Sequence, residues 1–250
     1  MKRALIVISL IAVVATSLLA QEEPIPPRRT KMGKVGLFGG FMPAWLSVDV
    51  KPINEFILGA KGAQLSENGI LMLGGGGAVY IMLLPNVRIG GMGTSGWLKS
   101  TSLDAGGIRR DAKLTVGYGG VTIEYVIPVV ERLDVSAGIM LGAGGIDLTM
   151  RVSNGGNNTW QSEQQYLNAG LGGTINNVTR TYSGAFFVWS PMVNVEYTML
   201  GWLAFRAGVS YLGMSFPSWQ VDGNYDLLGV PSKVSGKGFM VQGGVLLGVF

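Results

Sequence analysis

Charged side chains within otherwise apolar stretches are the residues of this sequence best placed to do chemistry. Glu124 and Asp134 flank one short connection, and two nearby carboxylates can act as general acid and base. The sequence has no histidine and no cysteine, so it lacks the usual base for a serine nucleophile and the usual ligands of zinc. Pairing with opposite charges explains these carboxylates more simply. We therefore expect no enzyme activity, no metal site and no cofactor.

A glycine pattern at residues 91–96 (GMGTSG) matches the G-x-G-x-x-G of dinucleotide-binding loops. Such a loop needs a helix directly after it, because the helix N-terminus holds the pyrophosphate. Trp97 and Lys99 instead lead into another strand-like stretch. In a chain with 40 glycines among 250 residues, we interpret the match as coincidental.

The charges lie in eight stretches whose apolar residues alternate or form short runs, as in β-strands. They cover residues 34–43, 69–84, 87–97, 112–127, 132–150, 182–198, 202–213 and 236–250. The connections are alternately long and short, at about 25, 2, 14, 4, 31, 3 and 22 residues. Outer-membrane barrels have this asymmetry, with short periplasmic turns and long external loops. We predict an all-β protein, an eight-stranded antiparallel up-and-down transmembrane β-barrel.

Alternation within the strands predicts which side chains face lipid and which face the barrel interior. Val121, Ile123 and Tyr125 share the lipid face, which leaves Glu124 inside. The charges assigned inward all lie near a short turn, so they share a depth near the periplasmic end. Because buried charges must be paired, we predict an internal structural cluster, with a proton or ion path as the alternative. The predicted cluster is Arg88, Glu124, Asp134, Glu196 and Arg206.

Residues 49–59 (DVKPINEFILG) predict a short helix in the first long connection. Asp49 or a neighbour would cap it, Pro52 would lie in its first turn, and Gly59 would end it. Its apolar face is formed by Ile53, Phe56 and Ile57. We expect this helix to pack over the mouth of the barrel. The alternative is a lid or plug that controls access to the interior.

Paired glycines recur in the middle of several strands. We interpret them as kinks that let the strands of a small barrel bend, with clearance for a ligand as the alternative. At Gly144 and Gly145 the polar positions move from even to odd residue numbers, which predicts a β-bulge.

The N-terminal region precedes the predicted barrel. Residues 1–20 have the basic start, apolar centre and small-residue end of a secretory signal peptide. Residues 21–33 are polar and proline-rich, as expected of a periplasmic lead-in. We assign residues 34–250 to the barrel domain.

The signal peptide, the eight strands, the turn and loop asymmetry and the terminal Phe250 together resemble small outer-membrane barrels of the OmpA/OmpX type. The resemblance is architectural, covers nearly all of the mature chain and includes no family-specific motif. It implies export to the outer membrane of a Gram-negative bacterium, contact with outer-membrane lipids, and insertion by the barrel-assembly machinery through the C-terminal strand. The implied assembly signal is Leu246, Gly248 and Phe250, a partial match because Gly248 replaces an apolar residue.

The sequence leaves three functions open. Of the 19 Lys and Arg residues, 17 remain when Lys2 and Arg3 of the signal peptide are left out, and the chain has 15 Asp and Glu residues. This nearly balanced charge gives no basic stripe that could bind nucleic acid. We expect a non-enzymatic barrel whose long external loops have a structural, adhesive or surface-protective role. One alternative is a small transport or binding barrel for a hydrophobic, lipid-like small molecule, and another is a soluble periplasmic barrel. The residues expected to line the hydrophobic pocket are Met72, Met82, Met92, Met140 and Met240.

Overall fold

The fold is a closed antiparallel ring of strands. The computed structural model describes residues 36–249 except 82–83, 154–176 and 231–237, with only the backbone at 216–218. The predicted signal peptide, the lead-in, Met82 and Phe250 lie outside the described residues. The strands are β1 Leu37–Phe41, β2 Ala44–Val48, β3 Ile70–Tyr80, β4 Val87–Leu103, β5 Arg109–Val130, β6 Leu133–Ser153, β7 Asn177–Leu200, β8 Leu203–Val221, β9 Tyr225–Asp226 and β10 Gly238–Val249.

The ring closes through β10, which pairs with β8 on one side and with β1 and β2 on the other. Strands β1 and β2 occupy one position in the wall, because both lie between β10 and β3 and only Met42 and Pro43 separate them. Strand β9 adds two residues beside the end of β8. The predicted eight-stranded antiparallel barrel is confirmed.

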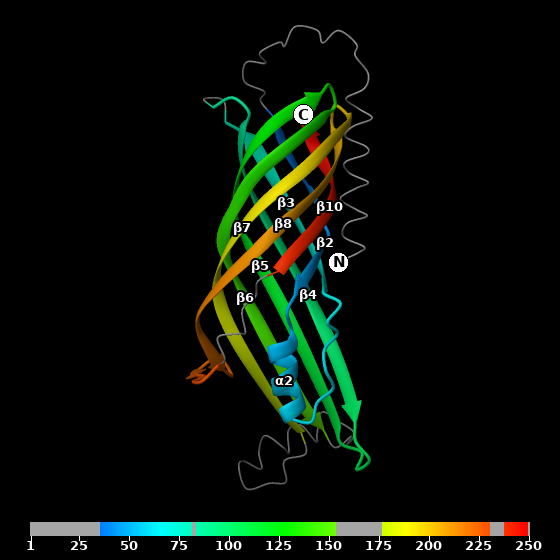
Figure 1. The fold of residues 1–250 in the computed structure, drawn as a ribbon, viewed down its shortest axis with the longest axis vertical. Helices are drawn as coiled ribbons and strands as arrows, with labels where there is room; N and C mark the ends of the chain where they lie inside the picture. The colour runs from blue at the N-terminus through cyan, green and yellow to red at the C-terminus, as the bar shows by residue number, and fades with distance from the viewer. Residues whose placement is uncertain (1–35, 82–83, 154–176, 231–237, 250) are drawn as a thin grey trace, which may run out of the picture. The chain divides into compact units, whose positions relative to one another are not determined.

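The two ends of the barrel differ. The connections at 131–132 and 201–202, and residues 84–86 before β4, lie at the same end as the last described residues of β10 (Figure 1). The helix α2, Lys51–Gly59, lies at the opposite end, as predicted. Pro52 is in its first turn, and the Asp49 carboxylate accepts the backbone N–H of Lys51 at 3.1 Å. Val50 occupies the N-cap position and provides no side-chain hydrogen bond.

Several strands continue further from the short turns than predicted. Strand β4 extends to Leu103 and β5 starts at Arg109, so residues 104–108 connect them instead of the predicted stretch of about 14 residues. This prediction was wrong because apolar alternation fades beyond Trp97 while the pairing of the backbones continues. Strand β8 likewise extends to Val221, beyond the expected end at residue 213.

The polarity of both faces reverses along the strands. Near the short turns of β6, Val135 and Ile139 face outward and Ser136 faces inward. Further along the same strand Asp147 and Arg151 face outward and Leu148 faces inward. Pairing with β5 and β7 runs unbroken through Gly144 and Gly145, so the predicted β-bulge is wrong. The side chains keep their alternation, and what changes is the surroundings of the outer face.

The inner faces of the long strands enclose an apolar core in the half away from the short turns. It combines side chains of β2, β3, β5, β6, β7, β8 and β10 with residues of the first long connection. Leu114 and Val116 of β5, and Phe186 and Val188 of β7, are among its buried members. This core fills the interior under α2.

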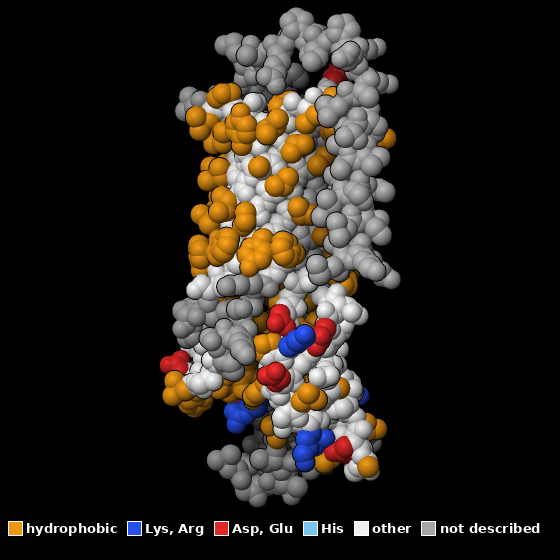
Figure 2. All heavy atoms as spheres, viewed as in Figure 1, with side chains coloured by type: hydrophobic (Ala, Val, Ile, Leu, Met, Phe, Trp, Pro, Cys, Tyr) orange, Lys and Arg blue, Asp and Glu red, His pale blue; other side chains and the backbone are white. Residues whose placement is uncertain are grey.

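The outer surface carries an apolar band on the half near the short turns. Hydrophobic side chains cover the upper part of the face in Figure 2, whereas charged side chains gather mainly in its lower part. The exposed aromatic residues at the two edges of the band include Tyr125, Tyr197 and Trp202 near the short turns and Trp45, Trp97 and Trp189 on the far side. At a rise of about 3.3 Å per residue and a tilt of about 40°, the segment of β7 from Phe187 to Tyr197 gives a band about 25 Å high. Among the residues described, no helix has the length and apolar character needed to cross a membrane.

Candidate functional site

Two directly opposed ion pairs lie inside the barrel near the short turns. Arg88 of β4 faces Glu124 of β5, and Glu196 of β7 faces Arg206 of β8. All four side chains point inward, and each residue is exposed by 6% or less. The alternation of the strands explains this, because each charge is flanked along its strand by lipid-facing apolar residues.

Arg88 joins both glutamates. Its Nη2 lies 2.6 Å from Oε2 of Glu124, and its Nη1 lies 2.7 Å from Oε2 of Glu196. Its Nη2 also donates to Oε1 of Glu196. The guanidinium carbon lies 5.0 Å from the centre of the Phe38 ring on β1, a distance at which a cation–π interaction contributes.

Arg206 closes the cluster from the other side of the barrel. Its Nη2 lies 2.7 Å from each carboxylate oxygen of Glu124, and its Nη1 lies 3.4 Å from Oε1 of Glu196. Each arginine thus contacts both glutamates, and strands that are far apart in the ring are joined through the interior. Arginine suits this role because its planar guanidinium presents several fixed donors to carboxylates.

Asp134, the fifth predicted member, lies at the edge of the cluster. It is directly opposite Glu196 in the register of β6 and β7, and it is half-buried. The four-residue core of mutual ion pairs is formed by Arg88, Glu124, Glu196 and Arg206. Asp134 thus lies in the same row as Glu196, next to that core.

Three uncharged side chains extend the cluster and were missed in the sequence. Ser136 accepts from Arg88 at 3.1 Å and donates to Glu124 at 2.9 Å. Asn194 donates to Ser136 at 3.3 Å, and Gln242 donates to Asn194 at 2.8 Å. Strand parity was the available signal for Ser136 and Asn194. Gln242 was missed because the sequence did not settle which face of the last strand points inward.

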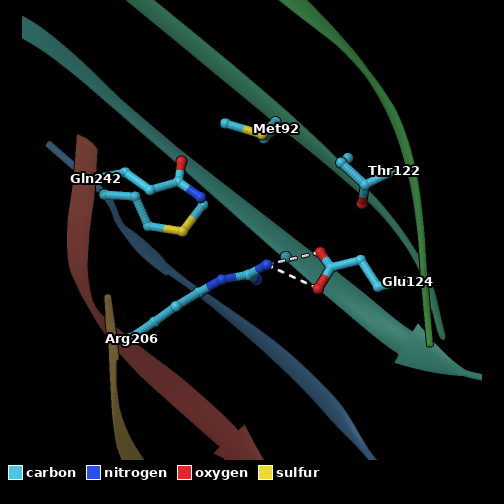
Figure 3. Close-up of a pocket in the computed structure, with 8 residues that line it drawn as sticks. Met92, Thr122, Glu124, Arg206 and Gln242 are labelled. Atoms are coloured by element: carbon cyan, nitrogen blue, oxygen red, sulfur yellow. Dashed lines mark hydrogen bonds and ion pairs between the residues drawn. The ribbon is translucent and has the colours of Figure 1, made fainter. Parts of the chain in front are cut away.

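A small cavity lies beside the cluster. Gln242, Arg206 and Glu124 line it together with Thr122 and Met92 (Figure 3). It has room for about one water molecule. Arg206 Nε and Gln242 Oε1 are buried and have no protein partner among the described residues. Both residues line the cavity, so it suits internal hydration.

The chemistry available to the cluster is limited by its pairing. Both glutamates form ion pairs with both arginines, so each carboxylate is already occupied by cations of the protein itself. Of the residues described, no three His, Cys, Asp or Glu side chains gather to hold a metal ion. The arrangement fixes strands to one another across the interior.

The predicted lid residues divide between two environments. Ile53 and Ile57 are buried in the apolar core, with Leu65 packed against the same core. Phe56 is 48% exposed, and its ring meets that of Tyr182 on β7 edge-on at 5.2 Å between centroids. Phe56 therefore does not enter the core with its two neighbours, because it points along the rim towards β7.

Asn54 fixes the segment that follows the helix, and the sequence did not single it out. Its side chain donates to the carbonyl of Leu65 at 3.0 Å and accepts from the N–H of Leu65 at 2.7 Å. The residue is 2% exposed, so both polar ends of its amide are satisfied in a buried setting. The signal in the sequence was the position of Asn54, a polar residue beside the isoleucines that form the apolar face of this short helix.

The methionines proposed to line a hydrophobic pocket are mostly part of the packed core. Met72, Met140 and Met240 are exposed by 1% or less and belong to the core cluster. Met92 is partly buried and lines the small cavity beside the charge cluster. Among the described residues, these side chains fill space instead of surrounding it.

The last strand has a clear inside and outside. Phe239, Val241, Val245 and Leu247 face outward, whereas Leu246 is fully buried on the inner face. Gly248 lies opposite Phe38 of β1, which it allows to approach closely, because a Cβ there would lie 2.5 Å from the Cα of Phe38. Recognition of this strand by an assembly machinery stays a prediction.

Comparisons with solved structures return outer-membrane barrels. A major outer membrane protein from Thermus thermophilus is 10% identical, with 86% of this chain and 100% of that chain covered at a TM-score of 0.43. OprG from Pseudomonas aeruginosa is 9% identical, with 87% and 94% covered at 0.41. The outer membrane protease OmpT from Escherichia coli is 9% identical, with 87% and 97% covered at 0.27. No protein-family model and no curated protein matches the chain.

Likeness at this level identifies no family and assigns no function. The architecture itself is that of the small eight-stranded outer-membrane barrels, as the strand pairing shows.

Proposed function

We propose that this chain is a non-enzymatic outer-membrane β-barrel whose external end has a structural, adhesive or surface-protective role. The observation that carries the proposal is the reversal of polarity along β6. Val135 and Ile139 face outward on one half, and Asp147 and Arg151 face outward on the other. A soluble barrel would have water around its whole length and no reason to expose apolar residues on one half only.

The dimensions of the apolar band support a bilayer as its surroundings. A height of about 25 Å is that of the lipid-facing band of outer-membrane barrels, and aromatic residues at both edges suit the two interfaces. The short turns would then face the periplasm. The same proposal includes how the chain reaches this membrane. Its signal peptide would direct export in a Gram-negative bacterium, and the barrel-assembly machinery would insert the barrel through β10.

The filled interior favours the external end as the functional part. The paired charges close the half near the short turns, and the apolar core with α2 fills the other half. This leaves little room for a substrate, which also weighs against the alternative of a transport or binding barrel for a hydrophobic molecule. The strands that project beyond the band provide a rigid platform for the connections at their ends.

Single cysteines can test the proposal, because the natural chain has none. Ile139→Cys places a thiol on the outer face within the band, and Thr149→Cys is the matched control on the outer face of the same strand beyond it. We expect a membrane-impermeant maleimide to label Thr149→Cys on intact cells and to leave Ile139→Cys unlabelled. Bimane at position 139, but not at 149, should be quenched by lipids with brominated acyl chains.

Equal labelling of both positions by the aqueous reagent in the folded protein would show that the band faces water. The protein would then be a soluble barrel, and the outer-membrane proposal would fail. Folding of each variant is checked by the heat-dependent shift in gel mobility. The external role is tested separately, by comparing attachment and serum survival of cells with and without the protein.

A further inference from the structure

Two lysines face each other on the outer surface just beyond the apolar band. Lys99 of β4 and Lys113 of β5 are direct partners in the register, and both are exposed. Thr149 of β6 follows in the same row, opposite Lys113, and its Oγ1 lies 3.5 Å from the hydroxyl oxygen of Thr181 on β7. Two ammonium groups and a pair of hydroxyls therefore lie side by side on one outward face.

Like charges directly opposite each other on a sheet are destabilising unless a counter-charge lies between them. Among the described residues, neither lysine forms an ion pair. The carboxylate of Asp111, in the row beyond, is held by Arg109 Nε at 2.9 Å and by Thr101 Oγ1 at 2.7 Å.

The remaining charges around the lysine pair leave it positive. Arg151 lies opposite Asp111 in the register, and Asp147 lies opposite Thr115 in the row on the band side. Across these three rows and the next row outward, which contains Arg109, four cations face two carboxylates: Lys99, Lys113, Arg109 and Arg151 against Asp111 and Asp147. The lysine pair is thus the part of this surface whose charge the protein does not neutralise.

The height of the pair relates it to the bilayer. Lys99 lies two residues beyond Trp97, an exposed tryptophan at the edge of the band. At a rise of about 3.3 Å per residue and a tilt of about 40°, its Cα is about 5 Å further out along the barrel axis. That distance separates the acyl chains of a bilayer from its headgroups, and flexible lysine side chains span it.

We propose that Lys99 and Lys113, with the Thr149 hydroxyl beside them, bind the phosphate group of an anionic lipid of the external leaflet. The lipid acyl chains would lie on the apolar band below, beside Trp97. This inference rests on the proposed outer-membrane location. A lipid is favoured over a free anion because the positive pair is continuous with an apolar surface, so that one amphiphile satisfies both.

The test uses the purified full-length protein in a zwitterionic detergent. Its binding to short-chain phosphatidic acid, to the matching diacylglycerol and to inorganic phosphate is measured by native mass spectrometry and by titration. The test variant is Lys99→Gln/Lys113→Gln. The matched control, Lys51→Gln/Lys61→Gln, removes two exposed positive charges from α2 and the residues after it.

We expect the natural protein to bind phosphatidic acid and to bind diacylglycerol and inorganic phosphate far more weakly. The test variant should lose about tenfold or more in affinity, because two charge-assisted hydrogen bonds disappear, and the control should stay within about twofold. The test variant should fold at least as well as the natural protein, since it removes a repulsion. The heat-dependent gel shift checks this.

Equal binding of phosphatidic acid by the two variants would overturn the inference, as would inorganic phosphate binding as tightly as the lipid. Cysteine labelling at positions 139 and 149 separates the two proposals. If that labelling supports a bilayer around the band and the lysine variant still binds normally, only the lipid site fails. If position 139 is open to water, both proposals fail.

Discussion

At the scale of single residues, the interior depends most on Arg88. It contacts both glutamates, Ser136 and the face of the Phe38 ring, and it is only 1% exposed. A buried ion pair is not by itself a large source of stability, because desolvation offsets much of the attraction. Removing one member is costly, since the remaining carboxylates are then buried with too few partners.

We predict that Arg88→Met lowers the free energy of unfolding by about 3–5 kcal/mol. The measurement is urea-induced unfolding of the protein in lipid vesicles. The matched control is Arg109→Met, which removes an arginine whose side chain is 57% exposed and paired with Asp111. A surface pair of that kind contributes about 1 kcal/mol or less, so equal losses in the two variants would contradict a structural role for the internal cluster.

The parity of single residues was predictable from the sequence. Inward placement of Arg88, Glu124, Glu196 and Arg206 follows from alternation with apolar neighbours, and the structure has all four inside. Their partners were less predictable. Which arginine contacts which glutamate depends on the register and on closure of the ring, and Ser136 carries no charge that would have drawn attention to it.

At the scale of the strand, glycines on the two faces have different roles. At inward-facing Gly90 a Cβ would lie 2.2 Å from the carbonyl oxygen of Gly77 and 2.8 Å from the Cβ of Ala78. At outward-facing Gly91 the nearest atom would be the carbonyl oxygen of Gly120, at 3.5 Å. Inward glycines therefore allow strands of a narrow barrel to approach closely, which leaves no space for a ligand at Gly90.

We predict opposite outcomes for two neighbouring substitutions in β4. Gly90→Ala should destabilise the barrel by about 1–3 kcal/mol, because the strands must separate to admit the methyl group. Gly91→Ala should be neutral or stabilise by up to about 1 kcal/mol, because it restricts the unfolded chain without a clash. Unfolding in urea, with the natural protein alongside, distinguishes them. Greater damage from Gly91→Ala would show that the faces have been assigned the wrong way round.

The connection between β4 and β5 is stabilised by one carboxylate. Asp104 Oδ1 accepts the N–H groups of Gly106 and Ile108 at 3.0 and 2.9 Å, and its Oδ2 accepts from Arg110 at 2.8 Å. The Arg110 hydrogen bond is the largest cause of a pKa for Asp104 below the ordinary 3.8, followed by the Ile108 N–H. The turn is therefore fully stabilised above about pH 4, and this is lost as the pH falls through the lowered pKa.

We predict that the amide resonances of Gly106 and Ile108 shift together with pH, with a midpoint below 3.8. The check is an NMR titration of the folded protein in detergent. In Asp104→Asn the same amides should show no such titration, because the side chain keeps an acceptor oxygen but carries no ionisable group. A midpoint above 3.8 in the natural protein would mean that the contacts to Asp104 do not favour its charged form.

The extent of the strands was the least predictable part of the fold. The sequence identified the strands within the apolar band, where alternation is strong, and the helix at residues 51–59, where Pro52 and Gly59 mark its limits. The prediction of strand ends failed beyond the band, because exposed polar residues such as Lys99 and Thr101 are typical of loops as well as of strands in water. The supposed bulge at Gly144 and Gly145 had the same origin, because a change of surroundings looks like a change of phase.

At the scale of the whole molecule, two different sets of side chains fill the interior of the barrel. The half near the short turns holds paired charges, amides and a small apolar cluster that includes Phe38 and Leu246, and the other half holds an apolar core covered by α2. Ile53 and Ile57 join that core, so the helix is part of the packing and its removal would expose apolar side chains. Permeation would require both halves to open.

We predict that the purified protein in a planar bilayer shows no steady conductance. The interior of an eight-stranded barrel is about one side chain wide, and ion pairs cross it from β4 to β7 and from β5 to β8. The matched comparison is Arg88→Met/Arg206→Met, which removes both guanidinium groups but leaves the apolar core, so it should stay closed as well. Large, stable currents from the natural protein would overturn the filled-barrel interpretation and favour transport. Currents from the double variant alone would show that the charge cluster is the principal barrier and that the core under α2 is permeable to ions.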